Sequence, residues 1–297
     1  MTTAMATRPT LPYFAPADTV PAPLPTVAEI RASTNILSPA GPNKTSKVVR
    51  VGRHFIVKYG PGVSLQEGEN MLFVRQATNV RVPTVYALFR EEATGDNFIV
   101  QEFIPGKSLA CHWNNFNAAS KEDVVAQLQR YFDELRRLPP PRPGFFCGVW
   151  EQDVLDFCLS NEECAHRVPR PLVFDSEERW VETMLIAASA QYMPRANRLP
   201  TLRRMYHAIF RNHGAVFTHA DLSLDNIQVH TDGGVVLIDW EYSGWYPHYW
   251  EFCRLMAWIG YKEHDGDFGE WVHRFLDEHP AELGWYILFE LWYSARF

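Results

Sequence analysis

Short runs of β-branched and aromatic residues, separated by turn signals, occupy the first third of the chain. Residues 47–51 and 54–59 flank a two-residue turn, which predicts a β-hairpin. Residues 82–90 and 97–103 predict two further strands, and the loose apolar face of residues 64–76 predicts a helix between the two pairs. The pattern therefore predicts a small lobe in the order strand, strand, helix, strand, strand.

Beyond a Gly-containing break that ends this lobe, the spacing of apolar residues becomes helical. Residues 120–137 and 202–212 place apolar side chains three and four positions apart, which predicts two helices. Residues 144–200 are irregular with helical pieces. Two short apolar runs, at 227–230 and 235–238, flank a turn rich in Asp and Gly and predict a second hairpin.

The N-terminal segment differs from the rest in composition. Residues 1 to about 28 are rich in proline, alanine and threonine, which forbids a helix and favours an extended arm. The arm is either disordered or packed along the body through Leu11, Tyr13 and Phe14. A short helix is expected near residues 26–34.

The overall composition is that of a globular protein, with 46% apolar and 14% aromatic residues among 297. No apolar run approaches the roughly 20 residues that span a bilayer, and the N-terminus lacks the pattern of a secretory signal. The five cysteines are scattered and odd in number, which indicates reduced thiols. We therefore expect a cytoplasmic protein without a membrane partner, while the oligomeric state stays open.

The formal net charge of −7 is unevenly distributed along the chain. Residues 240–297 contain 10 acidic and 4 basic side chains, a difference of −6. Charge of this sign argues against nucleic acid as a partner. It favours a cationic ligand, although a solvated acidic surface explains it equally well.

One stretch carries a chemical pattern, H-x-D-x-x-x-x-N, followed by an apolar strand that ends in an acid. Its polar members are His219, Asp221 and Asn226, and the acid is Asp239. Phosphoryl transfer from ATP needs a carboxylate beside the attacking hydroxyl and a set of oxygen ligands for Mg²⁺. Asp221 can supply the carboxylate. Asn226 and Asp239 can supply the ligands, because the hairpin between them returns Asp239 beside Asn226.

A lysine and two glutamates upstream fit the same chemistry. Lys58 lies at the end of the second strand, and Glu67 and Glu69 stand in the first turns of the following helix. A strand lysine can bind the α- and β-phosphates, and a helix glutamate can hold that lysine in place. We take Lys58 and Glu69 as the pair and Glu67 as the alternative acid, although each of these residues is ordinary when considered alone.

Together these segments resemble the aminoglycoside phosphotransferase and choline kinase group of small-molecule kinases, and in detail its fungal-type members. The matching segments are Val57-Lys58-Tyr59, Glu67-x-Glu69, Val82-Pro83, Ile99-Val-Gln-Glu-Phe-Ile-Pro-Gly106, His219-Ala-Asp221 to Asn226, and Ile238-Asp-Trp-Glu-Tyr-x-Gly-Trp-Tyr-Pro247. They cover roughly residues 45–260. The last two segments are specific, and the earlier ones are supportive.

The resemblance implies an α+β, bilobal protein-kinase-like fold. A small N-lobe would hold an antiparallel sheet and one helix, and a larger, mostly helical C-lobe would follow. On this basis the Pro-rich arm spans residues 1–32, the nucleotide-binding N-lobe spans 33–105, and the C-lobe with the catalytic loop and substrate site spans 106–297.

The resemblance also implies ATP and Mg²⁺ as cofactors and assigns roles to the polar residues. Asp221 would orient the acceptor hydroxyl and accept its proton. Asn226 and Asp239 would hold Mg²⁺. Lys58, braced by Glu69, would bind the α- and β-phosphates of ATP.

Contacts to the rest of the nucleotide are implied less completely. The backbone of Gln101 to Phe103 would form hydrogen bonds with adenine. No Gly-rich phosphate loop and no Walker A sequence is present. The nearest substitute is residues 41–47, in which Ser46 and nearby amides could contact phosphate.

Several departures from protein kinases indicate a small-molecule substrate. Ser223 stands where protein kinases carry lysine, and Asp239-Trp240-Glu241 replaces D-F-G with no later A-P-E. Ala220 occupies a position at which members of the resembled group often carry glycine. Altered activity therefore remains open.

The segment after Asp239 is rich in aromatic residues. A helical core explains most of its tryptophans. Trp240, Tyr242, Trp245 and Tyr246 follow Asp239 closely and are candidates for a substrate wall. With Glu241 and Glu251 they could hold a cation or an aromatic amine.

The leading hypothesis is an ATP-dependent kinase that phosphorylates a hydroxyl of a small molecule, for which cationic and aromatic compounds are the candidate classes. Two other hypotheses stay open. One is a non-catalytic kinase-like protein that binds nucleotide or a partner. The other is a kinase fold that has been turned to a different biosynthetic reaction.

Overall fold

The computed structural model describes residues 6–38, 45–156, 170–192, 199–259 and 265–294, together with residues 159 and 168. Within it the chain forms two compact units. The first comprises Met1–Lys107 and Gln228–Glu241, and the second comprises Ser108–Ile227 and Tyr242–Phe297. The division differs from the sequence-based one, because the arm and the hairpin that precedes Asp239 both join the first unit.

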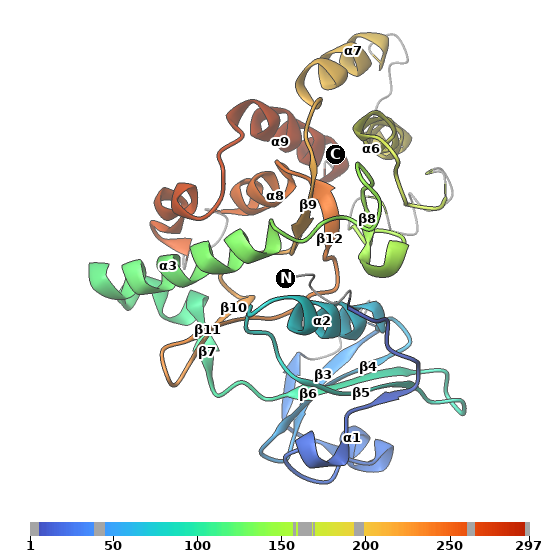
Figure 1. The fold of residues 1–297 in the computed structure, drawn as a ribbon, viewed down its shortest axis with the longest axis vertical. Helices are drawn as coiled ribbons and strands as arrows, with labels where there is room; N and C mark the ends of the chain where they lie inside the picture. Colours follow the sequence, from blue (N-terminus) through green and yellow to red (C-terminus); the bar gives the residue numbers. More distant parts are fainter. Residues whose placement is uncertain are drawn as a thin grey trace. The chain divides into compact units, whose positions relative to one another are not determined.

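The first unit is built on a six-stranded antiparallel sheet (Figure 1). Its strand order is β1-β5-β6-β4-β3-β2. The strands are β1 (Tyr13–Phe14), β2 (Ile36–Ser38), β3 (Lys47–Val51), β4 (Phe55–Gly60), β5 (Val85–Arg90) and β6 (Asn97–Glu102). The predicted hairpin and the two later strands are therefore present, with β5 beginning after Pro83, whose ring cannot donate to the ladder.

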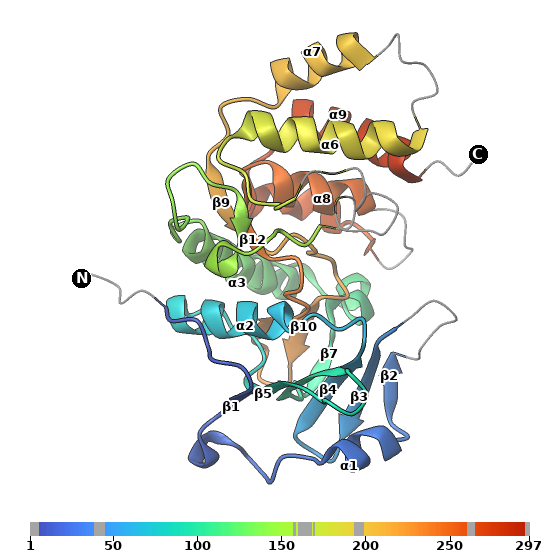
Figure 2. The same cartoon turned by 90° about the vertical axis from the view of Figure 1, so that its right-hand side faces the viewer.

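The alternation of side chains along β4 gives the sheet two different faces. Phe55, Val57 and Tyr59 pack with Ile30 in one apolar cluster, which residues of the arm extend. Ile56 and Lys58 point to the opposite face, where they line a cavity. Figure 2 shows α1 (Val27–Ala32) on one side of the sheet and α2 (Gln66–Ala77) on the other.

The proline-rich arm packs along this unit instead of leaving it. Tyr13 and Phe14 pair with β5 as an edge strand, and Ala17–Thr19 form a short 3-10 helix, η1. Thr26 caps α1 with a capping box that includes Glu29. The sequence had left packing and disorder as alternatives, and the described part of the arm packs.

A three-stranded sheet of order β11-β10-β7 completes the first unit. Its strands are β7 (Gly106–Ser108), β10 (Ile227–His230) and β11 (Val235–Leu237). The two later strands form the predicted hairpin. Asp239 follows β11 by two residues, so the hairpin delivers this acid to the first unit.

The second unit is mostly helical, as predicted for the later part of the chain. Its helices are α3 (Ala118–Leu135), α6 (Glu177–Tyr192), α7 (Leu199–Ile209), α8 (Trp250–Trp258) and α9 (Pro280–Ser294), with 3-10 turns η2 (Leu109–Cys111), η3 (Trp113–Asn115), η4 (Val149–Glu151) and η7 (Phe268–Arg274). A small antiparallel sheet of order β8-β12-β9 accompanies them. Its strands are β8 (Cys147–Gly148), β9 (Ala215–Thr218) and β12 (Gly244–Pro247).

Large aromatic side chains form the centre of the second unit. Trp180 of α6 and Trp250 of α8 are fully buried and meet edge to face, with ring centroids 4.8 Å apart. Tyr246 and Tyr286 pack against the same ring of Trp250. The helix that carries Trp180 was the element least visible in the sequence, because its apolar residues lack a clear helical period.

Two further expectations from the sequence concern membrane-spanning helices and the state of the cysteines. Among the described helices, none combines the length and the apolar character needed to cross a membrane. Cys111, Cys147 and Cys253 are free thiols, and the remaining two cysteines lie outside the described residues.

Candidate active site

One lysine in the first unit lies among three carboxylates. Lys58 Nζ is 2.6 Å from Glu67 Oε2, 3.3 Å from Asp239 Oδ1 and 3.4 Å from Glu241 Oε2. The Lys58 side chain is 15% exposed and that of Glu67 is 3% exposed. We call these four residues the lysine corner. It joins β4, α2 and the segment after β11.

The period of α2 explains which glutamate holds the lysine. Glu67 and Asn70 are three residues apart and share one face of the helix. Glu67 binds Lys58 there, and Asn70 Nδ2 donates to Trp240 O at 2.8 Å. Glu69 is bound instead by Arg8 of the arm, with Nε 2.9 Å from Oε1. The predicted pair Lys58–Glu69 was therefore wrong, and the alternative acid Glu67 is the partner.

The lysine corner contains one positive charge and three negative charges. Burial by itself lowers the pKa of Lys58, but the three neighbouring carboxylates raise it above its ordinary value. Burial raises the pKa of Glu67 to about 7, with Asp239 and Glu241 adding to the rise and Lys58 opposing it. The excess of negative charge contributes to the raised pKa of both groups, because it favours any added proton. A bound cation would relieve the same excess.

Asp239 stands in a backbone conformation that L-residues seldom adopt. Its φ is +65°, in the left-handed region, which costs a non-glycine residue about 1 kcal/mol. The segment is fixed from both sides. Asn70 binds Trp240 O, and the indole nitrogen of Trp240 donates to Leu237 O at 2.9 Å. Such locally unfavourable backbone is typical of functional positions. The sequence reading missed Asn70, although its spacing from Glu67 could have revealed it.

A cavity of about 470 Å³ adjoins the lysine corner within the first unit. This volume is typical of small-ligand sites. Its walls are largely apolar, with polar groups at one end. They comprise Leu37, Ser38, Ser46, Val48, Ile56, Lys58, Glu67, Pro83, Gln101, Glu102, Phe103, Ile104, Gln228, Ile238 and Asp239. The structure therefore brings together five of the predicted site residues: Ser46, Lys58, Gln101, Phe103 and Asp239.

The backbone amides at the edge of this cavity are mostly already used. Glu102 N donates to Thr84 O, and Phe103 N donates to His54 O, each at 2.8 Å. The expectation that the Phe103 amide binds a base is therefore corrected, since a single N–H has one strong acceptor. Within the described parts of the chain, Ile104 N has no acceptor, and Ile104 also lines the cavity.

The predicted catalytic loop lies in the second unit, after β9. Asn226 Nδ2 donates to Asp221 O at 2.8 Å and to Asp221 Oδ2 at 3.1 Å. The amide oxygen of Asn226 is thus the atom of this side chain that can serve as a metal ligand. The Asp221 side chain is 37% exposed. His219 is fully buried, and its Nδ1 accepts from Asp221 N, so it holds the loop as expected.

Two charged residues of α8 support this loop by forming hydrogen bonds with its backbone. Glu251 is fully buried and accepts from His219 N at 2.6 Å and from Ala220 N at 3.2 Å. Arg254 Nε donates to Ala220 O, and its Nη2 lies 3.6 Å from Asp221 Oδ1. Both residues were missed as supports of the loop. The sequence contains a signal for them, because Glu251 and Arg254 lie three positions apart in an otherwise apolar helix.

Ala220 is the point on which these contacts converge. Its φ is +65°, and its side chain is fully buried. A left-handed residue here explains why glycine suits the position. The Ala220 amide donates to Glu251, and the Ala220 carbonyl accepts from Arg254. These two hydrogen bonds hold the strained conformation in this chain.

Comparison with known proteins identifies the family. The Phosphotransferase enzyme family (APH) matches residues 41–286. The chain belongs to this family. A sequence comparison with curated proteins finds no match.

Solved structures of aminoglycoside phosphotransferases resemble this phosphotransferase in fold. A thermostable mutant of APH(4)-Ia with ADP and hygromycin B has a TM-score of 0.55 at 14% identity, over 86% of this chain and 82% of that one. ADP-bound APH(2'')-Ib has a TM-score of 0.55 at 14% identity, over 88% and 83%. The GDP and kanamycin complex of APH(2")-IIia has 0.56 at 13%, over 89% and 87%. The α+β, bilobal protein-kinase-like fold is thereby established.

The two tryptophans expected in a substrate wall of this phosphotransferase are buried. Trp240 is fully buried, and its indole nitrogen binds Leu237 O. Trp245 is 3% exposed, packs edge to face on Phe217, and donates to Leu138 O. Both are core residues, because strand-end aromatics gain more by burial than by facing solvent. Glu241 belongs to the lysine corner, and the buried Glu251 is unavailable to a ligand cation.

Proposed function

We propose that this phosphotransferase transfers the γ-phosphoryl group of ATP to a hydroxyl of a small molecule. The observation that carries the proposal is the lysine corner beside a cavity of nucleotide-binding size. Membership of a phosphotransferase enzyme family supports it. The three structural relatives are described with ADP or GDP, and two of them with an aminoglycoside.

The first unit supplies groups for the nucleotide. Lys58, held by Glu67, binds the α- and β-phosphates, and the free amide of Ile104 donates to the base. The apolar walls formed by Val48 and Ile56 enclose the base. Ser46 lines the same cavity and is proposed to contact phosphate.

The donor set of the lysine corner fits Mg²⁺. Oxygens of Glu67, Asp239 and Glu241 lie within 4.8 Å of one another, and carboxylate oxygens are the ligands that Mg²⁺ prefers. In the first unit Asp239 is proposed to hold the ion, and in the second unit the amide oxygen of Asn226 is the candidate ligand. A bound ion would supply positive charge that offsets the charge of the phosphates.

The second unit supplies the group that activates the acceptor. Asp221 accepts the proton of the attacking hydroxyl, and Asn226 orients its carboxylate. The hydroxyl oxygen forms a bond to the γ-phosphorus while the bond from that phosphorus to the bridging oxygen of ADP breaks. Arg254 fixes the backbone beneath Asp221 and keeps this carboxylate in place.

The proposal is tested with purified protein, Mg²⁺ and either ATP or GTP against amino alcohols, aminoglycosides, neutral polyols and aromatic alcohols. We expect nucleoside diphosphate release together with a product that has gained one phosphate group. Asp221→Asn should lower the rate about 10³-fold, the scale of general-base catalysis. Asp123→Asn, an exposed position of α3, is the matched control.

Three outcomes would contradict the proposal. Full activity of Asp221→Asn, with an unchanged thermal unfolding profile, excludes the assigned base. Nucleotide binding without transfer to any acceptor supports a non-catalytic nucleotide-binding protein. Consumption of an acceptor without gain of phosphate supports a fold turned to another reaction.

A further inference from the structure

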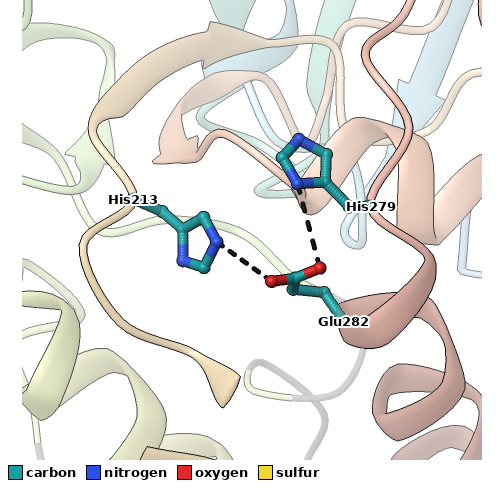
Figure 3. A group of neighbouring side chains, drawn as sticks. All are labelled: His213, His279 and Glu282. Carbon is teal, nitrogen blue, oxygen red and sulfur yellow. Dashed lines mark ion pairs between the residues drawn. The ribbon is translucent and has the colours of Figure 1, made fainter. Parts of the chain in front are cut away.

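A second cluster of ligand-type side chains lies in the second unit. His213 precedes β9, and His279 and Glu282 lie at the start of α9. His213 Nε2 is 3.2 Å from Glu282 Oε1, and His279 Nδ1 is 3.9 Å from Glu282 Oε2. One ligand atom from each residue lies within 4.8 Å of the other two. Figure 3 shows both imidazole rings turned toward the Glu282 carboxylate.

The far side of the His213 ring is held by a fourth residue. Glu177, the first residue of α6, lies 2.6 Å from His213 Nδ1 and also accepts from His213 N at 2.9 Å. A carboxylate behind the ring holds the proton on Nδ1, so an ion that displaces the proton of Nε2 can bind the lone pair of that nitrogen. This arrangement is the usual support for a metal-binding histidine.

The charges of the cluster are not balanced by the described side chains around it. Glu177 and Glu282 are 10% and 15% exposed, and His213 between them can carry one positive charge. His279 turns Nδ1 toward Glu282, and its Nε2 is buried without a hydrogen-bond partner, so no described carboxylate holds this ring from behind as Glu177 holds His213. One divalent ion with two neutral histidines would balance the two carboxylates.

Other charged and aromatic side chains flank the cluster. Asp277 pairs with His248, and Tyr249 covers the His213 ring.

We infer that His213, His279 and Glu282 form a binding site for a divalent transition metal ion, with Zn²⁺ as the best match. Two imidazoles and one carboxylate are a common zinc ligand set, which leaves a fourth position for water. Zinc bonds of about 2.0–2.1 Å place tetrahedral ligand atoms about 3.3 Å apart. One ligand atom from each residue already lies within 4.8 Å of the other two, so the three side chains must close in by up to about 1.5 Å to reach this spacing.

The site has a structural consequence for the second unit. It joins the segment before β9 to the start of α9, two segments about 65 residues apart in the sequence. β9 leads directly into the loop with His219 and Asp221. A bound ion would therefore fix the strand that carries the catalytic loop, without contacting the reacting groups.

Isothermal titration with Zn²⁺ tests the inference on tag-free protein in excess Mg²⁺, which occupies sites made of carboxylates alone. We expect one ion per chain with micromolar or tighter affinity, and proton release that follows the displacement of the His213 proton. Co²⁺ in place of Zn²⁺ should give the intense visible absorption of a four-coordinate ion. Absence of saturable binding would overturn the proposal.

Matched variants locate the bound ion. Glu282→Gln and His279→Asn should each weaken Zn²⁺ binding at least tenfold, and Glu177→Gln should weaken it about 10- to 100-fold through the His213 ring. His273→Ala, an exposed histidine of η7, should leave the affinity unchanged. Circular dichroism checks the fold of each variant. Equal affinity in all four would place the ion elsewhere and refute the assignment.

Discussion

The lysine corner of the first unit and the catalytic loop of the second unit are organised in opposite ways. In the lysine corner, side chains contact side chains, and Lys58 faces three carboxylates. In the catalytic loop, side chains of α8 hold backbone atoms, and Arg254 lies beside Asp221. The lysine corner has three negative charges around one positive charge, whereas Asp221 of the loop lies beside Arg254 and the Glu251 carboxylate accepts from backbone amides.

This difference indicates what each region is built to do. An excess of negative charge can be kept only if something relieves it, by a proton or by a cation. A loop held through its backbone keeps one geometry whether or not a ligand is present. We therefore expect the lysine corner to respond to pH and to cations, and the catalytic loop to respond mainly to changes in its support.

The largest expected effect is on the support of the loop. Glu251→Gln removes the charge that accepts from His219 N and Ala220 N, and it turns an amide N–H₂ toward those donors. We expect the free energy of unfolding to fall by about 3 kcal/mol, the scale of a broken buried charged contact. Urea denaturation measures it, with the exposed Glu270→Gln as control. Equal stability of the two variants would refute the backbone support.

The next effect separates the two glutamates of α2. Glu67→Gln removes the brace of Lys58, and a misplaced phosphate-binding group costs about 10²-fold in rate. Glu69→Gln alters the contact with Arg8 and leaves the Lys58–Glu67 contact in place, so the rate should stay within about threefold of the parent. Phosphotransfer rates of the two variants decide between them. A greater loss of phosphotransfer rate in Glu69→Gln than in Glu67→Gln would support the pair Lys58–Glu69 instead.

A pH effect follows from the lysine corner alone. The pKa of Glu67 is about 7 in the fold and ordinarily 4.5, so the folded chain binds more protons between these values. The free energy of unfolding contributed by Glu67 therefore falls as the pH rises from 4.5 to 7. The folded and unfolded chains differ by at most one proton bound at Glu67. The free energy of unfolding therefore changes by at most about 1.4 kcal/mol per pH unit. Denaturation at several pH values, without Mg²⁺, should show a steeper fall in the parent than in Glu67→Gln.

The smallest effect concerns the strained residue of the loop. Ala220→Gly removes the Cβ that disfavours a φ of +65° and should raise the free energy of unfolding by up to about 1 kcal/mol. The melting temperature should rise by about 2 °C. Ala215→Gly in β9, where φ is not positive, should lower it instead. A fall in both variants would show that Ala220 is not strained.

The sequence predicted the elements of the first unit well because they depend on local patterns. The hairpin of β3 and β4 and the following helix α2 were visible in alternating and helical spacing. The sequence did not predict helix α6 as a single element, because its apolar residues are spread around its surface. The position of this helix depends on the aromatic core. Trp240 and Trp245 were misjudged for a related reason, since proximity in sequence to Asp239 says nothing about burial.

By itself, the sequence determined the residue types and spacings of the catalytic pattern, which are local properties of the chain. Only the tertiary structure decided which acid holds Lys58. Glu67 and Glu69 differ by two positions and have the same chemistry, and the orientation of α2 against the sheet turns one toward Lys58 and the other toward Arg8. The tertiary structure likewise brought His213 to Glu282, because no local pattern relates residues that far apart along the chain.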